Sequence, residues 1–241
     1  FGISDAGAML CGYDGEKITL EEIHRFPNTP VTEDGHLRWD IDELFEQIKV
    51  GISFGVFNGG FDAISVSAWG YDFGLTDRNG ELLEKPVHFL DGRTEGVAED
   101  IFARISPDEL YRESGVQPRR INTLFQLAAL SAYDRNTLFR AEKMLLIPDL
   151  FVYFLTGEYR SEYTGAATTQ LIEQSSRGWN IRLIETLGLP KRIFCPIVRP
   201  GEVCGGLKFD LAEEFRCDQV PVIACPSHDT AAAVLAVPCA D

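Results

Sequence analysis

The sequence has 241 residues, a length that fits one large domain or two small ones. Its 37 acidic and 22 basic residues give a net charge of −15, which opposes unassisted binding to nucleic acid or to an anionic membrane. Hydrophobic residues at 45% and charged residues at 24% are ordinary for a globular protein, and they argue against disorder, collagen and coiled coil.

The first part of the chain predicts β-hairpins. Segments 8–13 and 18–26 flank Asp14-Gly15, a pair suited to a tight turn. Residues 63–69 form a short β-type run, and residues 71–76 lead into a second turn that ends in Asn79-Gly80.

A helix is predicted between these hairpins. Apolar residues recur at the three-and-four spacing of one helix face over residues 41–52. Asp40 with Glu43 three residues later resembles a capping box.

The middle of the chain predicts helices alternating with buried strands. Ser106-Pro107 with Glu109 forms a capping box at a helix that ends at Gly115. The order of elements favours an α/β fold with a mixed sheet flanked by helices, without internal repeats. The further expected elements are helix 124–130, strand 143–147, helix 148–155 closed by Gly157, helix 180–187 closed by Gly188, and strand 220–225.

The cellular compartment is inferred from cysteine usage and hydropathy. The longest apolar stretch, residues 144–155, is interrupted by Asp149 and is too short to cross a bilayer, and no signal peptide is predicted. No two cysteines have metal-type two-residue spacing, so we expect reduced thiols in a cytoplasmic protein. The cysteines are Cys11, Cys195, Cys204, Cys217, Cys225 and Cys239.

Several catalytic motifs are absent: the GxxxxGK[ST] phosphate loop, HExxH, GxGxxG and paired CxxC. Residues 51–55 do fit GxSxG with Ser53 at the centre, and His228 lies downstream. A nucleophile elbow needs a strand before the serine, whereas the segment here is predicted to be helical. A helix with small residues is therefore favoured over a serine hydrolase.

The segment 227–230, Ser-His-Asp-Thr, lies between a predicted buried strand and a run of small residues. A carboxylate at such a junction is held rigidly, and alanines allow a ligand or another backbone to approach closely. The alternative interpretation is that Asp229 or Thr230 caps the following helix.

Motifs over nearly the whole chain resemble the N-terminal half of FGGY-family carbohydrate kinases and, within that family, the rhamnulokinases. The matching stretches are residues 22–28 (EIHRFPN), 38–42 (RWDID), 68–74 (AWGYDFG), 91–94 (DGRT), 114–117 (SGVQ), 122–127 (NTLFQL), 146–149 (LIPD), 155–158 (LTGE), 162–164 (EYT), 168–171 (TTQL) and 227–231 (SHDTA).

The resemblance implies an actin-like ATPase or ribonuclease-H-like domain with a mixed five-stranded sheet flanked by helices. It implies an enzyme that uses ATP and Mg²⁺ to phosphorylate the 1-hydroxyl of L-rhamnulose, with the sugar as partner and no nucleic acid or membrane. Residues 1–241 would be the sugar-binding domain, inactive in isolation, and the C-terminal nucleotide-binding domain would lie outside this chain.

The resemblance also implies functional residues. Asp229 matches the catalytic base, and Gly70, His228 and Thr230 match sugar-binding positions, with the missing side chain of the glycine leaving room for the ligand. Trp69, Asp91 and Arg93 are further sugar-binding candidates, although each is open to interpretation as a structural aromatic residue or an ion-pair member.

The expected phosphate-binding loop departs from the family pattern. It consists of Ile3, Ser4, Asp5, Ala6 and Gly7, and the metal-associated aspartate of the family would lie before residue 1, so no metal ligand is predicted here. Gly7 replaces a basic residue and Asp5 adds negative charge beside the phosphates. Ser67-Ala68 and Phe89-Leu90 also differ from the pattern, which leaves two alternatives open: a catalytically weak sugar-binding or regulatory homologue, and a kinase for a related ketose.

Overall fold

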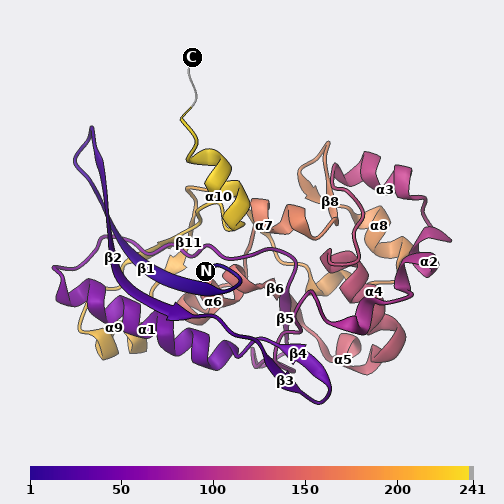
Figure 1. Ribbon diagram of the computed structural model, residues 1–241, viewed down its shortest axis with the longest axis horizontal. Helices are drawn as coiled ribbons and strands as arrows, with labels where there is room; N and C mark the ends of the chain where they lie inside the picture. The colour runs from indigo at the N-terminus through magenta and orange to yellow at the C-terminus, as the bar shows by residue number, and fades with distance from the viewer. Residues whose placement is uncertain (239–241) are drawn as a thin grey trace.

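Two hydrophobic cores organise residues 1–238, the part of the chain that the computed structural model describes. One core lies under the hairpin β1–β2 and the helices α1, α6 and α9, and the other lies among α2, α4 and α8 (Figure 1). The helices are α1 Ile41–Phe57, α2 Val97–Phe102, α3 Pro107–Ser114, α4 Thr123–Tyr133, α5 Arg135–Arg140, α6 Ile147–Thr156, α7 Tyr163–Thr168, α8 Ile181–Thr186, α9 Phe209–Phe215 and α10 Asp229–Leu235, with 3-10 turns at Gly92–Thr94 and Lys191–Ile193. The strands are β1 Asp5–Tyr13, β2 Ile18–Pro27, β3 Val31–Glu33, β4 His36–Arg38, β5 Phe73–Thr76, β6 Lys143–Leu146, β7 Ser161–Glu162, β8 Ile172–Glu173, β9 Gly178–Trp179, β10 Ile197–Val198, β11 Val203–Gly206 and β12 Pro221–Ile223.

The first predicted hairpin is confirmed. Strands β1 and β2 pair antiparallel, and the Asp14 side chain accepts hydrogen bonds from the amides of Glu16 and Lys17 while Gly15 takes a φ of 102°. The register shifts between Ala8 and Met9, beyond which the hairpin extends from the body of the protein (Figure 1).

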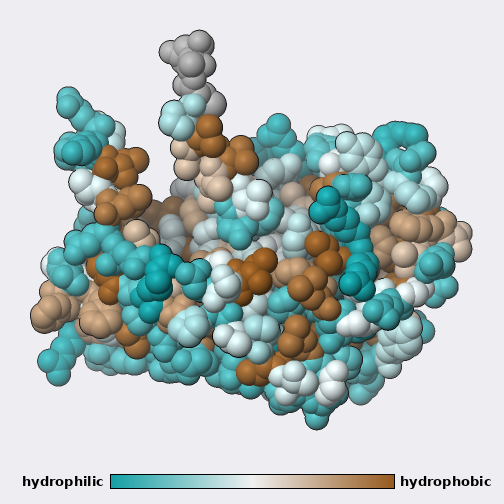
Figure 2. Space-filling model, in the orientation of Figure 1, coloured by the Kyte–Doolittle hydropathy of each residue, from teal (hydrophilic) through white to brown (hydrophobic). Residues whose placement is uncertain are grey.

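Apolar side chains on the outer half of the β1–β2 hairpin are exposed, and so are apolar side chains of the segment at α10 (Figure 2). They are Met9, Tyr13, Ile18 and Leu20 on the hairpin, and Val234, Leu235 and Val237 at α10.

Helix α1 contains the whole GxSxG segment, so that motif marks close packing in place of a nucleophile elbow. A Cβ atom at Gly51 would lie 2.8 Å from the Cβ of Ala8 on β1, and one at Gly55 would lie 3.0 Å from the ring of Phe61. Ser53 is exposed and donates to the Lys49 carbonyl within the helix. The structure therefore gives no support to a serine hydrolase.

The expected five-stranded sheet is only partly formed as continuous ladders. The described strands pair in six two-stranded ladders. The run at 63–69 makes isolated parallel bridges, Ile64 with Val222 and Ala68 with His228, instead of a regular strand. Strand β12, which contains Val222, also pairs antiparallel with β11. The central crossing thus depends on a few backbone hydrogen bonds between segments about 160 residues apart.

The second core is closed by an antiparallel ladder between β5 and β6, which also reaches the first core. Leu145 on β6 packs in the first core, whereas Met144 and Leu146 pack in the second. This alternation follows from the two-residue period of a strand, which directs successive side chains to opposite faces. Strand β6 therefore joins the two cores.

Helix termini follow the predicted signals with one exception. Ser106 accepts from the Glu109 amide, and helices α3 and α6 are followed by Gly115 and Gly157 at φ values of 69° and 79°. Asp40 precedes α1 as predicted, but the capping-box prediction is wrong because its side chain makes no capping hydrogen bond. Its carboxylate instead lies 3.3 Å from the Lys85 ammonium.

The described residues bear on two predictions, that the chain has no membrane-spanning helix and that its cysteines are reduced. Within residues 1–238, no helix combines the length and the apolar character needed to span a membrane. Cys11, Cys195, Cys204, Cys217 and Cys225 are all free thiols, as expected. Cys239 lies outside the described residues.

The packing of α1 on β1 is tested by Gly51→Val. We expect the free energy of unfolding to fall by about 1–3 kcal/mol, because the new side chain overlaps Ala8 in a filled core. Ser53→Ala is the matched control two residues along, and its unfolding should match the wild type. Chemical denaturation measures both, and a stable Gly51→Val protein would contradict the packing argument.

Candidate functional site

The site is built where two distant backbone segments cross. The Ala68 amide donates to the Ser227 carbonyl at 2.8 Å, and the Asp229 amide donates to the Ala68 carbonyl at 2.9 Å. These parallel bonds hold Trp69-Gly70 beside His228-Asp229. The crossing therefore brings together four of the residues proposed from sequence, although they are separated by about 160 positions.

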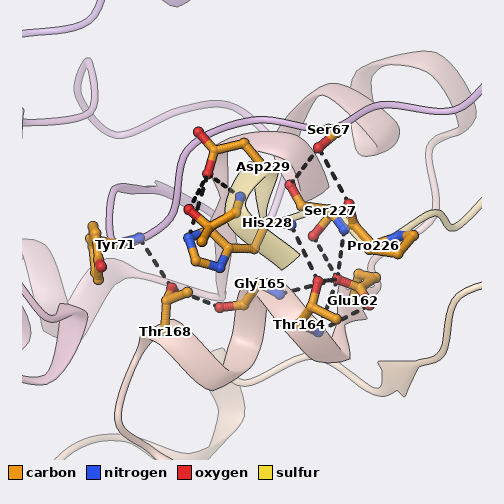
Figure 3. A network of polar contacts seen from close by, with 11 residues as sticks. Ser67, Tyr71, Glu162, Thr164, Gly165, Thr168, Pro226, Ser227, His228 and Asp229 are labelled. Carbon is orange, nitrogen blue, oxygen red and sulfur yellow. Dashed lines mark hydrogen bonds and ion pairs between the residues drawn. The ribbon is translucent and has the colours of Figure 1, made fainter. Parts of the chain in front are cut away.

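Asp229 is the first residue of α10, and its carboxylate is partly open to solvent, with 41% of the side chain exposed. One carboxylate oxygen accepts from the Thr230 amide at 2.5 Å and from the Thr230 hydroxyl at 3.1 Å. The helix N-cap residue is His228, whose side chain makes no capping bond. Asp229, which lies beside His228 in Figure 3, thus satisfies one local amide while its carboxylate stays partly exposed.

His228 is half-buried between Asp229 and an aromatic ring. Its Nε2 lies 3.5 Å from the Asp229 carboxylate, and its ring meets the Tyr71 ring edge-on at 6.3 Å. Burial lowers the pKa of His228 below its ordinary value, against the opposing effects of Asp229 and Glu162. The imidazole is therefore neutral at pH 7 and does not form an ion pair with Asp229.

Gly70 adjoins a side chain in place of an open ligand space, which corrects the reason given for its role. A Cβ atom at Gly70 would lie 2.8–3.0 Å from three atoms of the Thr168 side chain. The Thr168 hydroxyl accepts from the Tyr71 amide at 3.1 Å, and Tyr71 itself has a φ of 79°. The glycine is thus required by close packing that fixes a strained residue beside His228.

Trp69 belongs to a buried polar network centred on Asp72. The indole N–H groups of Trp39 and Trp69 donate to Asp72 at 2.6 and 3.0 Å, and the Gln126 amide donates at 3.3 Å. Burial raises the pKa of Asp72 to about 7, because the three hydrogen bonds only partly offset the loss of water. Trp69 is only 2% exposed, which supports its interpretation as a structural aromatic residue, and its contact with sugar remains a proposal.

Asp91 and Arg93 are also occupied by protein contacts. Asp91 accepts from the amides of Leu37 and Arg93 and lies 3.1 Å from His36, and these contacts outweigh burial and lower its pKa. Arg93 donates to the Gln126 side chain at 2.6 Å, and burial lowers its pKa. These protein contacts support a structural role for Asp91 and Arg93, and their contact with sugar remains a proposal.

The expected phosphate loop forms a tight turn and then a strand. The Gly2 amide donates to the Asp5 carbonyl, Ala6 is buried in the core, and Gly7 pairs with Arg25 in β1–β2. Asp5 forms an ion pair with Arg25, which compensates its negative charge. Ile3 and Ser4 are exposed. No cluster of His, Cys, Asp or Glu within residues 1–238 is arranged to hold a metal ion.

Sequence reasoning did not assign a role to Glu162, Thr164, Thr168 or Tyr71. All four lie around the crossing (Figure 3). Glu162 and Thr164 occur in a matching stretch, but their relation to His228 depends on a fold that brings positions about 65 residues apart into contact. An acidic residue in a matching stretch was the signal available for Glu162, and the structure adds that this residue is buried.

The sequence was compared with protein families and curated proteins. Residues 13–236 match the model of the FGGY family of carbohydrate kinases, N-terminal domain. The chain belongs to this FGGY family. It is 39% identical to a rhamnulokinase of Oceanobacillus iheyensis and 37% identical to one of Halalkalibacterium halodurans, over 98% of this chain and 50% of each relative. The chain thus spans about half the length of these curated relatives.

Solved structures of sugar kinases share the fold. A xylulose kinase from Rhodospirillum rubrum superposes with a TM-score of 0.85 at 16% identity, covering 98% of this chain and 50% of that one. A carbohydrate kinase from Novosphingobium aromaticivorans gives 0.81 at 24% identity, covering 98% and 50%. The predicted fold class, an α/β domain of the actin-like ATPase type, is confirmed.

The role of Gly70 is tested by Gly70→Ala. We expect the free energy of unfolding to drop by about 1–3 kcal/mol, since the methyl group overlaps Thr168. Adding Thr168→Ala should recover part of this loss by removing the overlapping atoms, as a double-mutant cycle by denaturation would measure. Two independent, additive losses would contradict direct packing between these residues.

The raised pKa of Asp72 predicts that the free energy of unfolding depends on pH. Its pKa rises from 3.8 to about 7 on folding, so the folded state holds a proton that the unfolded state releases. The resulting contribution to stability is full below pH 3.8 and declines as pH rises to about 7. Asp72→Asn should remove this decline. The difference in unfolding free energy, variant minus wild type, should therefore increase between pH 4 and 7, and a flat difference would contradict the shifted pKa.

Proposed function

We propose that this chain is the sugar-binding, base-carrying part of an ATP-dependent ketose kinase that phosphorylates the 1-hydroxyl of L-rhamnulose. The observation that carries the proposal is the crossing that fixes Asp229, half-exposed, at the start of α10 beside Gly70 and His228. The rhamnulokinase relatives support the choice of sugar over other ketoses. Free thiols in residues 1–238 are consistent with the proposed cytoplasmic location.

In the proposed mechanism, the Asp229 carboxylate accepts the proton of the sugar hydroxyl as its oxygen attacks the γ-phosphorus of ATP. Phosphoryl transfer has a loose transition state, so positioning and electrostatics dominate, and a fixed carboxylate is sufficient as a base. The neutral His228 lines the same surface and is available to hydrogen-bond a sugar hydroxyl. ATP supplies the phosphoryl group: the bond between the γ-phosphorus and its bridging oxygen breaks, and ADP is the leaving group.

The binding of ATP and Mg²⁺ is not assigned to residues of this chain. Ala6 and Gly7 lie within β1, Asp5 is paired with Arg25, and residues 1–238 contain no cluster suited to a metal. No described residue is assigned to Mg²⁺, and no step of the mechanism is routed through it. The departure of residues 3–7 from the family pattern, with Asp5 paired to Arg25, supports a second candidate, a homologue that binds sugar without turnover.

The base is tested by Asp229→Asn in the longest natural form of the protein, with ADP release measured in the presence of L-rhamnulose, ATP and Mg²⁺. We expect kcat to fall by about 10²–10⁴-fold, the usual contribution of a positioned proton acceptor. Asp218→Asn, an exposed carboxylate outside the site, should behave as the wild type.

Two other results would change the assignment. Sugar binding by calorimetry without ADP formation by the wild type would favour the regulatory homologue. Faster turnover of L-fuculose or xylulose than of L-rhamnulose would retain the kinase and replace its substrate.

A further inference from the structure

Below the crossing lies a buried carboxylate that sequence reasoning did not assign. Glu162 is 2% exposed and receives five hydrogen-bond donors. The amide and hydroxyl of Thr164 and the amide of Gly165 come from α7. The amide and hydroxyl of Ser227 come from the segment that carries the proposed base, at 3.0 and 2.8 Å.

These contacts reach the two residues that precede Asp229, Ser227 and His228. Glu162 binds Ser227 directly, and the Thr164 hydroxyl both donates to Glu162 at 2.5 Å and accepts from the His228 amide at 3.2 Å. On the opposite side, Ala68 holds the Asp229 amide. The peptide units of three successive residues are therefore fixed from two sides, by Glu162 with α7 (Figure 3) and by Ala68.

The environment of Glu162 differs from that of its buried neighbour Asp149. Asp149 accepts the Glu162 amide with one oxygen, and its other oxygen has no partner. Burial raises the pKa of Asp149 well above its ordinary value, and the charge of Glu162 acts in the same direction. All five donors are directed at Glu162 instead. Such complete satisfaction is what a buried carboxylate requires, because unpaired burial of a polar group is costly.

We propose that Glu162 is a positioning residue for the Asp229 base, acting through Ser227 and His228. It holds the backbone that leads into α10 and so sets the direction of the Asp229 carboxylate. The inference rests on the proposed function, in which Asp229 accepts the sugar proton. Positioning matters because a displacement of about 1 Å in a reacting group can reduce a rate by about 10²-fold.

The test is Glu162→Gln in the longest natural form of the protein, assayed for ADP release with L-rhamnulose. The amide NH₂ would face donors, so the bonds to Ser227 and Thr164 cannot all persist. We expect kcat to fall at least tenfold while the KM for the sugar stays within about threefold. Asp149→Asn is the matched control, since it replaces a neighbouring buried carboxyl and keeps an oxygen for the Glu162 amide; its kcat should equal the wild type.

A double-mutant cycle separates positioning from a general loss of structure. In the Asp229→Asn background, Glu162→Gln should cause no further loss of kcat, because there is no base left to position. Thr164→Val removes the hydroxyl that links Glu162 to His228 and provides the same test if Glu162→Gln does not fold. It should also lower kcat without raising KM.

Several outcomes would overturn the inference. A folded Glu162→Gln or Thr164→Val protein with wild-type kcat would do so while leaving Asp229 as the base. Equal losses with and without Asp229 would also overturn it, since they would show an effect independent of the base. No sugar-dependent ADP release by the wild type would overturn the proposed function itself, and the inference with it.

Discussion

The short parallel contact between residues 64–68 and 222–229 is the constraint on which the site depends. It is made of isolated bridges instead of a long ladder, and it places Trp69-Gly70 beside His228-Asp229. Because so few hydrogen bonds hold the crossing, its geometry is maintained by what packs around it. Thr168 packs against Gly70, Glu162 accepts a hydrogen bond from the Ser227 hydroxyl, and Asp72 accepts one from the Trp69 indole.

Local structure was predictable wherever a local physical rule decides it. The Asp14-Gly15 turn, the Ser106 cap and the helix ends at Gly115 and Gly157 all follow from backbone conformations and hydrogen bonds made within a few residues. Asp40 is the instructive exception. Its position before α1 was correct, but a lysine 45 residues away offered the carboxylate an ion pair, and the sequence contains no local sign of that choice.

The site was only half predictable, for a related reason. Asp229 and His228 stand in a distinctive segment, and resemblance to a kinase family gave them roles. The environment that holds them comes from α7 and from residues 67–72, and no periodicity or motif spacing states that these elements meet. Gly70 shows the limit clearly: the sequence singled out its position, but the packing that requires a glycine there involves Thr168, about 100 residues away.

The exposed apolar side chains of the β1–β2 hairpin and of α10 have a consequence for the behaviour of the chain in solution. Exposed apolar side chains on two molecules attract each other because their contact removes apolar surface from water. The net charge of −15 acts against this contact, because molecules of like charge repel each other. Dissolved salt weakens that repulsion beyond about 8 Å at physiological ionic strength and does not weaken the apolar attraction. The balance between dispersed and associated molecules is therefore set by ionic strength as much as by protein concentration.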